Sequence, residues 1–74
     1  MNIKELKEVV RYEETLDFLH NTAYIRLTTK VNNKSYFVFH TFNPRVLPSP
    51  QRMIKIKEDL FEALLDNING VNHD

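Results

Sequence analysis

The chain has 74 residues, with ten basic and ten acidic side chains, a net charge of zero and no cysteine. Its length allows one domain with a thin margin of stability, and the lack of cysteine excludes disulfides and thiolate metal sites. No apolar run approaches the roughly 18 residues that span a membrane, and the charged first residues do not form a signal peptide, so we expect a cytoplasmic protein.

The first expected element is a helix over residues 2–10. Asn2 can accept a hydrogen bond from the backbone of the first turn, and Glu5 stands at the third position of a capping box. The apolar residues that follow recur at the spacing of one helical face: Ile3, Leu6, Val9 and Val10.

Residues 11–19 fit two structures. The spacing of Tyr12, Leu16 and Leu19 continues a helix, whereas the alternation of apolar and polar residues over 12–18 is typical of a half-buried strand. Because two consecutive glutamates are poor strand formers, the pattern favours a helix here, with a strand as the alternative.

Residues 23–42 are expected to form a β-hairpin. Two alternating segments rich in β-branched and aromatic residues flank Asn32-Asn33, and asparagine tolerates the positive φ of a tight turn. The second segment is apolar on both of its faces, which indicates an inner strand or one covered on both sides.

The last third of the chain is a loop followed by a helix. Three prolines stiffen residues 43–50, and Ser49-Pro50 reads as the N-cap and first position of a helix that stops at Gly70. The alternation over 53–57 leaves a short strand there as an alternative. Residues 1–70 are therefore expected to form one compact α+β domain, α-β-β-α or α-β-β-β-α, with two helices packed on one face of an antiparallel sheet, and residues 71–74 a disordered tail.

The charges are segregated along the chain. No acid occurs between Phe18 and Lys57, a segment with seven basic residues, whereas residues 58–74 have five acids and no base. A basic middle between acidic ends indicates a surface for an anionic partner.

Nucleic acid is the favoured partner. Arg26 and Lys30 share a strand face with Tyr24, and basic residues neutralise phosphates while exposed aromatics stack on bases. We expect Tyr36, His40 and Phe42 to flank them from the second strand of the hairpin. The full set of expected binding residues is Tyr24, Arg26, Lys30, Lys34, Tyr36, Arg45 and Arg52.

Catalysis is not expected. The three histidines lie in unrelated contexts and none has metal-ligand spacing, so no metal, cofactor or catalytic residue is predicted. His40, among aromatics on the hairpin, is expected to be a packed residue rather than a general base.

A protein partner, either an acidic protein or one that binds nucleic acid itself, is the alternative. A small chain with a stiff proline loop and a free strand edge can act as an inhibitor or adaptor of the kind encoded by phages or mobile elements, and it can form a homodimer.

The α-β-β-β-α arrangement resembles the layout of double-stranded-RNA-binding domains and of small toxins of the HicA type. The likeness to the toxins lies in the helix containing Glu5-Leu6 and in the stretch from Phe39 to Arg45. It implies a small ribonuclease as a third function. The glycine, small residue, histidine motif that would supply a catalytic histidine is absent, so the chain is not assigned to that family.

Overall fold

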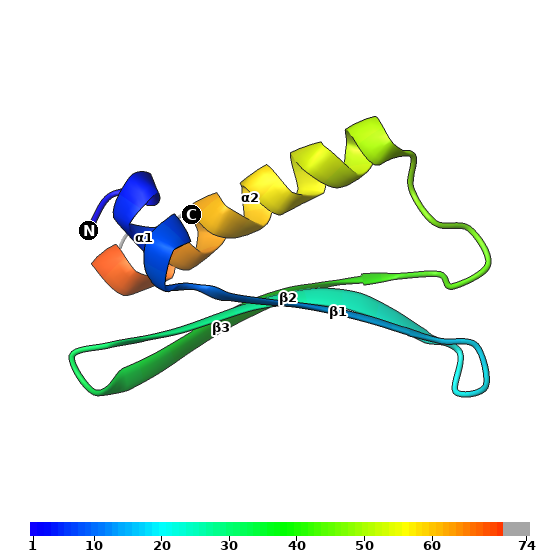
Figure 1. Ribbon diagram of the computed structural model, residues 1–74, viewed down its shortest axis with the longest axis horizontal. Coiled ribbons are helices and arrows are strands. Elements are labelled where there is room, and N and C mark those ends of the chain that lie inside the picture. Colours follow the sequence, from blue (N-terminus) through cyan, green and yellow to red (C-terminus); the bar gives the residue numbers. More distant parts are fainter. Residues whose placement is uncertain (71–74) are drawn as a thin grey trace.

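The computed structural model describes residues 1–70, which form five elements. In chain order these are α1 (Ile3–Val9), β1 (Arg11–Asp17), β2 (Thr22–Val31), β3 (Lys34–Phe42) and α2 (Pro50–Asn69). The strands make one antiparallel sheet in the order β1-β2-β3, and both helices lie on the same side of it (Figure 1). The α+β class and the placement of two helices on one sheet face are therefore confirmed; the tail expected over 71–74 lies outside the described residues.

Helix α1 begins and ends where its sequence predicts. The Asn2 side chain accepts a hydrogen bond from the Glu5 N–H at 2.9 Å, which satisfies one of the free donors of the first turn. Val10 adopts an extended conformation and stops the helix. Leu6 is completely buried, so this seven-residue helix is held by one deeply packed side chain rather than by its own propensity.

The helix favoured for residues 11–19 is wrong, because residues 11–17 form strand β1 and a turn follows. Seven residues of β1 pair with β2, from Arg11 opposite Thr28 to Asp17 opposite Thr22. The poor strand propensity of the two glutamates is offset by ion pairs with residues that are distant in the sequence. Glu13 pairs with Arg26 of β2, and Glu14 pairs with Lys57 of α2. Ladder pairing to β2 decided a pattern that was locally ambiguous.

The predicted hairpin is confirmed as β2 and β3. Asn32 and Asn33 both have positive φ, 51° and 65°, as the two central residues of a type I′ hairpin turn require. Val31 pairs with Lys34 across the turn, and the ladder runs without a break to Ala23 opposite Phe42.

Helix α2 also has the predicted ends. The Ser49 hydroxyl accepts a hydrogen bond from the Arg52 N–H at 3.3 Å, Pro50 is the first helical residue, and Gly70 closes the helix in the left-handed region at φ 71°. The helix is continuous through residues 53–57, so the alternative of a short strand there is wrong.

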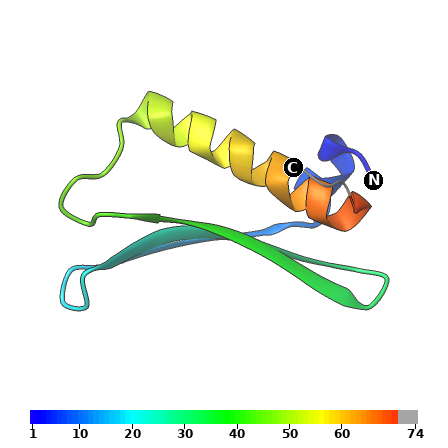
Figure 2. The same cartoon turned by 180° about the vertical axis from the view of Figure 1, so that it is seen from behind.

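The core lies between the sheet and α2. Alternate residues of β2 point towards the helices and are buried, and they pack with α2 and α1. The buried apolar cluster consists of Leu6, Ile25, Leu27, Ile56, Leu60 and Leu64. Figure 2, the view from behind, shows α2 running above the sheet and approaching it most closely near its C-terminal end. No helix within residues 1–70 is long and apolar enough to cross a membrane.

Candidate nucleic-acid interface

The sheet has one face that no helix of the described chain covers. Ala23, Ile25, Leu27 and Thr29 are buried under the helices, so the alternate residues of β2 point to the opposite side. The pairing register then assigns the neighbouring side chains of β1 and β3 to this open face. Its residues are Arg11, Glu13, Thr15 and Asp17 from β1, Thr22, Tyr24, Arg26, Thr28 and Lys30 from β2, and Ser35, Phe37, Phe39 and Thr41 from β3.

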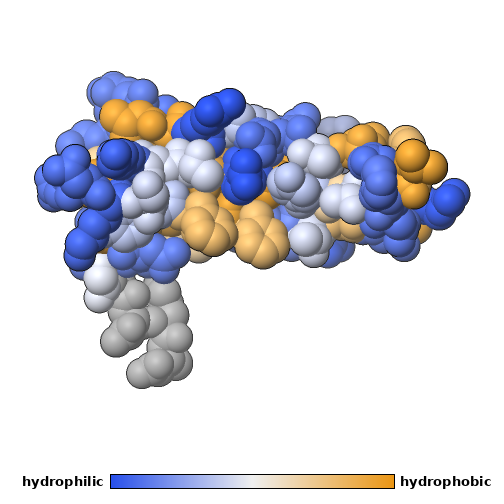
Figure 3. Space-filling view, turned by 90° about the horizontal axis from the view of Figure 1, so that it is seen from below, coloured by the Kyte–Doolittle hydropathy of each residue, from blue (hydrophilic) through white to orange (hydrophobic). Residues whose placement is uncertain are grey.

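Two phenyl rings lie in the open face on β3. Phe37 is 60% exposed and Phe39 56% exposed, although both are large apolar side chains. Their ring planes differ by 12° and their centroids are 6.3 Å apart. Figure 3 looks onto the open face and shows hydrophobic surface near its middle, bordered by more polar surface. Full burial of such a side chain would contribute about 1.5–3 kcal/mol, and much of this is forgone here, so the pair forms an exposed apolar patch.

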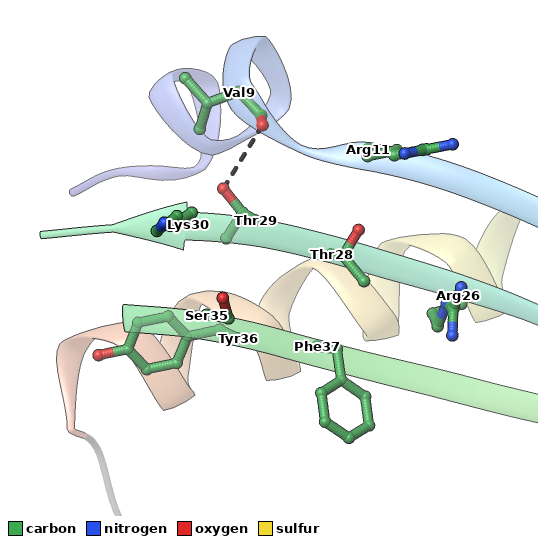
Figure 4. Close-up of a pocket in the computed structure, with 9 residues that line it drawn as sticks. All are labelled: Val9, Arg11, Arg26, Thr28, Thr29, Lys30, Ser35, Tyr36 and Phe37. Carbon is green, nitrogen blue, oxygen red and sulfur yellow. Dashed lines mark hydrogen bonds between the residues drawn. The ribbon is translucent and has the colours of Figure 1, made fainter. Parts of the chain in front are cut away.

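Shallow hollows surround the two rings. One, of about 240 Å³, lies between Tyr24, Arg26, Thr41 and the two phenylalanines. A larger one of about 510 Å³ extends along the sheet towards the hairpin turn, and Figure 4 shows its residues, with Phe37 on β3 and Thr28 and Arg26 on the neighbouring strand β2. Both hollows have Arg26 and Phe37 in their walls, so they adjoin each other on the sheet.

The open face is modestly basic. The guanidinium of Arg26 lies 2.5 Å from the Glu13 carboxylate, and its Nε atom is buried without a hydrogen-bond partner. Arg11 and Lys30 form no ion pair with another residue of 1–70, so their charges are available to an anion. Asp17 is engaged by His20 at 2.7 Å, and hydrogen bonds from His20 lower the pKa of this carboxyl.

The acidic part of the chain lies on the other side of the molecule. Glu58, Asp59, Glu62 and Asp66 belong to α2, which covers the sheet face opposite to the open one. Asp59 is paired with Lys55 at 3.1 Å and raises the pKa of that amine. A polyanion approaching the open face is therefore separated from the acidic half of α2 by the sheet.

The structure brings three of the seven expected binding residues together, namely Tyr24, Arg26 and Lys30. Lys34 and Tyr36 point to the helix side of the sheet at the hairpin end, where they line a hollow with Ile68 and Asn69. Arg45 lies in the exposed loop and Arg52 in the first turn of α2.

The expectation that Tyr36, His40 and Phe42 flank Arg26 and Lys30 is wrong for His40 and Phe42, and Tyr36 reaches the larger hollow only at the hairpin end of the sheet. The register pairs Arg26 with Phe39 and Thr28 with Phe37, and it places the three expected residues on the helix side, with Phe42 and Tyr36 packed against the core. The residues missed were Phe37, Phe39 and Arg11. The two-residue turn at Asn32-Asn33 contained the signal for the two phenylalanines, since it requires residues whose numbers add to 65 to face each other.

Within residues 1–70, His20 is paired with the Asp17 carboxylate on the exposed turn after β1, and His40 lies elsewhere. His40 lies beside the Phe42 ring, with centroids 4.8 Å apart, on the helix side of the sheet. Within residues 1–70 no group of three or more histidine, aspartate or glutamate side chains could hold a metal ion.

No protein-family model, curated protein or solved structure matches the chain.

Proposed function

We propose that the chain is a non-catalytic module that binds single-stranded nucleic acid on the open face of its sheet. The observation that carries the proposal is the pair of exposed, nearly parallel rings of Phe37 and Phe39 beside the basic residues Arg26 and Lys30. The absence of cysteine suits a reducing cytoplasm, where we place this activity.

The rings can each take one base. Stacking of a base on an aromatic side chain contributes about 1–3 kcal/mol and tolerates any sequence, because every base has a π face. The 6.3 Å between the ring centroids is nearly twice the rise of about 3.4 Å between stacked nucleotides of one strand. Neighbouring bases that each stack on one ring would lie farther apart than stacked neighbours do, as the splayed bases of a single strand can.

The charges on and around the open face favour the same ligand. Arg11 and Lys30 can each neutralise a phosphate, and each such contact lowers the logarithm of affinity by about 0.7 per tenfold rise in salt for a single strand. The acidic half of α2, residues 58–69, repels phosphates from its own part of the opposite face.

The test is fluorescence anisotropy with labelled 12-nucleotide single strands of DNA and RNA, and with a matched duplex, at 50 mM and 500 mM salt. Phe37→Ala with Phe39→Ala should weaken single-strand binding at least tenfold, because two stacking platforms are removed. Phe18→Ala is the matched control, since Phe18 is equally exposed, at 57%, but lies in the turn after β1. Failure of the native chain to bind any of these nucleic acids at 50 mM salt would refute the proposal.

A protein partner is the second candidate, and a separate surface favours it. The helix-facing side chains of β1 are only partly covered: the Lys57 amine lies over the Tyr12 ring, and Leu16 is 50% exposed. Leu16 joins Leu47 and Met53 around a hollow of about 280 Å³ that opens between the sheet and the start of α2. If this surface docks an inhibitor target or adaptor partner, affinity loss should concentrate at Leu16, as binding energy does in protein interfaces. An affinity unchanged by Leu16→Ala would exclude this surface.

A further inference from the structure

We infer that two copies of this chain pair through the free edge of β3, joining their sheets into one antiparallel sheet of six strands. β3 is an outer strand in the order β1-β2-β3. In Figure 2 it lies in front of the sheet and no other described element runs alongside it. The inference does not require nucleic-acid binding, because it rests on the free edge of β3 and on the side chains that would meet across that edge.

The hairpin turn determines which backbone groups reach this edge. In a two-residue hairpin the residues that flank the turn, Val31 and Lys34, exchange hydrogen bonds, and such pairs alternate along the ladder. The even-numbered residues of β3 are thus bonded to β2. Ser35, Phe37, Phe39 and Thr41 direct their N–H and C=O groups outward, where a further strand could bond them.

The two edges of the sheet differ in their protection against pairing. β1 carries four charged residues, Arg11, Glu13, Glu14 and Asp17, and charged side chains discourage an additional strand. β3 has nine residues and no carboxylate, and its one lysine is its first residue. An edge strand that is long, apolar and without charged residues is a template for pairing with a further strand.

A second copy is the occupant that fits, because β3 is complementary to itself when run antiparallel about Val38. This register pairs all nine residues and brings the outward backbone groups opposite one another. On the open face Phe37 meets Phe39 of the second copy, and Ser35 meets Thr41. On the helix side Tyr36 meets His40. Aromatic pairs and hydroxyl pairs stabilise neighbouring strands, and no like charges are opposed.

The helices favour the same arrangement. Arg52 and Ile56 line a hollow with His40 and Phe42, so this side of α2 faces the β3 edge. A two-fold axis through Val38 makes the two α2 helices antiparallel, so the end with Arg52 points towards the acidic half, residues 58–66, of the other copy. Unlike charges therefore lie across the pair of helices.

The test uses the absence of cysteine, which makes any introduced thiol unique. In the inferred register Val38 faces Val38 of the second copy at a non-hydrogen-bonded site, where Cα atoms are about 4.5 Å apart and within disulfide range. Val38→Cys should form a covalent dimer under mild oxidation. Ser35→Cys is the control, since the two copies of residue 35 would be about 20 Å apart, six residues at about 3.4 Å each.

Sedimentation equilibrium of the unmodified chain completes the experiment. A dimer is expected, and Phe37→Lys with Phe39→Lys should be monomeric because two lysine pairs then face each other; mixing it with Phe37→Glu and Phe39→Glu should restore a heterodimer. Circular dichroism checks that each variant is folded. A monomeric native chain at 500 μM, equal cross-linking at positions 35 and 38, or a lysine variant that remains dimeric would overturn the inference.

Discussion

If the open face binds single strands as proposed, Glu13 should limit its affinity for phosphate, and replacing Glu13 with glutamine should strengthen binding. Glu13 holds the guanidinium of Arg26 at 2.5 Å, so this arginine is already neutralised where the two hollows meet. Glu13→Gln keeps the shape of the side chain and removes its charge. Arg26 would then be free to bind a phosphate.

The expected gain in affinity comes from two electrostatic interactions between solvent-exposed groups. Both side chains of the pair are one third to two fifths exposed, so solvent screens them. Gaining an Arg26–phosphate contact and losing the repulsion from Glu13 should contribute about 0.2–1 kcal/mol each. Together these amount to about 2- to 30-fold in affinity at low salt, at about 1.4 kcal/mol per tenfold. The salt slope should steepen by about 0.7.

The assay is the anisotropy titration of a labelled single strand repeated between 50 mM and 500 mM salt. Glu62→Gln is the control, because it makes the same change in net charge on exposed α2. If both variants strengthen binding equally, the gain comes from net charge alone and the reasoning about Arg26 is refuted. An unchanged slope for Glu13→Gln would refute it as well.

Three further predictions concern the fold. Leu64 is fully buried, so Leu64→Ala should lower the free energy of unfolding measured in urea by about 2–5 kcal/mol. The total expected for a chain of this length is about 4–11 kcal/mol. A loss below about 1 kcal/mol would contradict the central place of Leu64 in the core. Asn33→Ala should cost about 1 kcal/mol because φ is 65°, whereas Asn33→Gly should cost nothing; equal thermal midpoints would disprove the turn geometry. Asp17→Asn should destabilise the fold at pH 7 and have no effect near pH 2. The reason is that a lowered carboxyl pKa stabilises the folded state above about pH 3.9, the unfolded value, and this contribution is lost as pH falls through the folded pKa. An effect independent of pH in thermal melts would contradict this.

The ends of the elements could be read from single residues because they depend on local chemistry. Asn2 and Ser49 cap their helices by accepting hydrogen bonds from residues only three positions further along the chain. Gly70 ends α2 through its own backbone conformation. Strand β1 could not be read in this way. Its spacing fits a helix and a strand equally, and pairing with residues 22–28 decided between them.

The composition of the open face was only half predictable for a related reason. Alternation along β2 correctly grouped Tyr24, Arg26 and Lys30, since it depends only on strand geometry. The strand β3 is apolar on both faces, so its composition does not show which face the helices cover. The two-residue turn sets the register that places Phe37 and Phe39 on the same face as Arg26 and Lys30. The turn does not determine that this face is exposed.

By itself the sequence determined the hairpin and its turn, both helix ends, the α+β class and the segregation of charge. Each of these depends on residues that are close together along the chain. Only the tertiary structure decided that residues 11–17 form a strand, that α2 covers β2 and β3 but leaves β1 partly bare, and that Phe37 and Phe39 face solvent. Those outcomes depend on which apolar surfaces bury each other across long separations in sequence, a competition that local propensity does not settle.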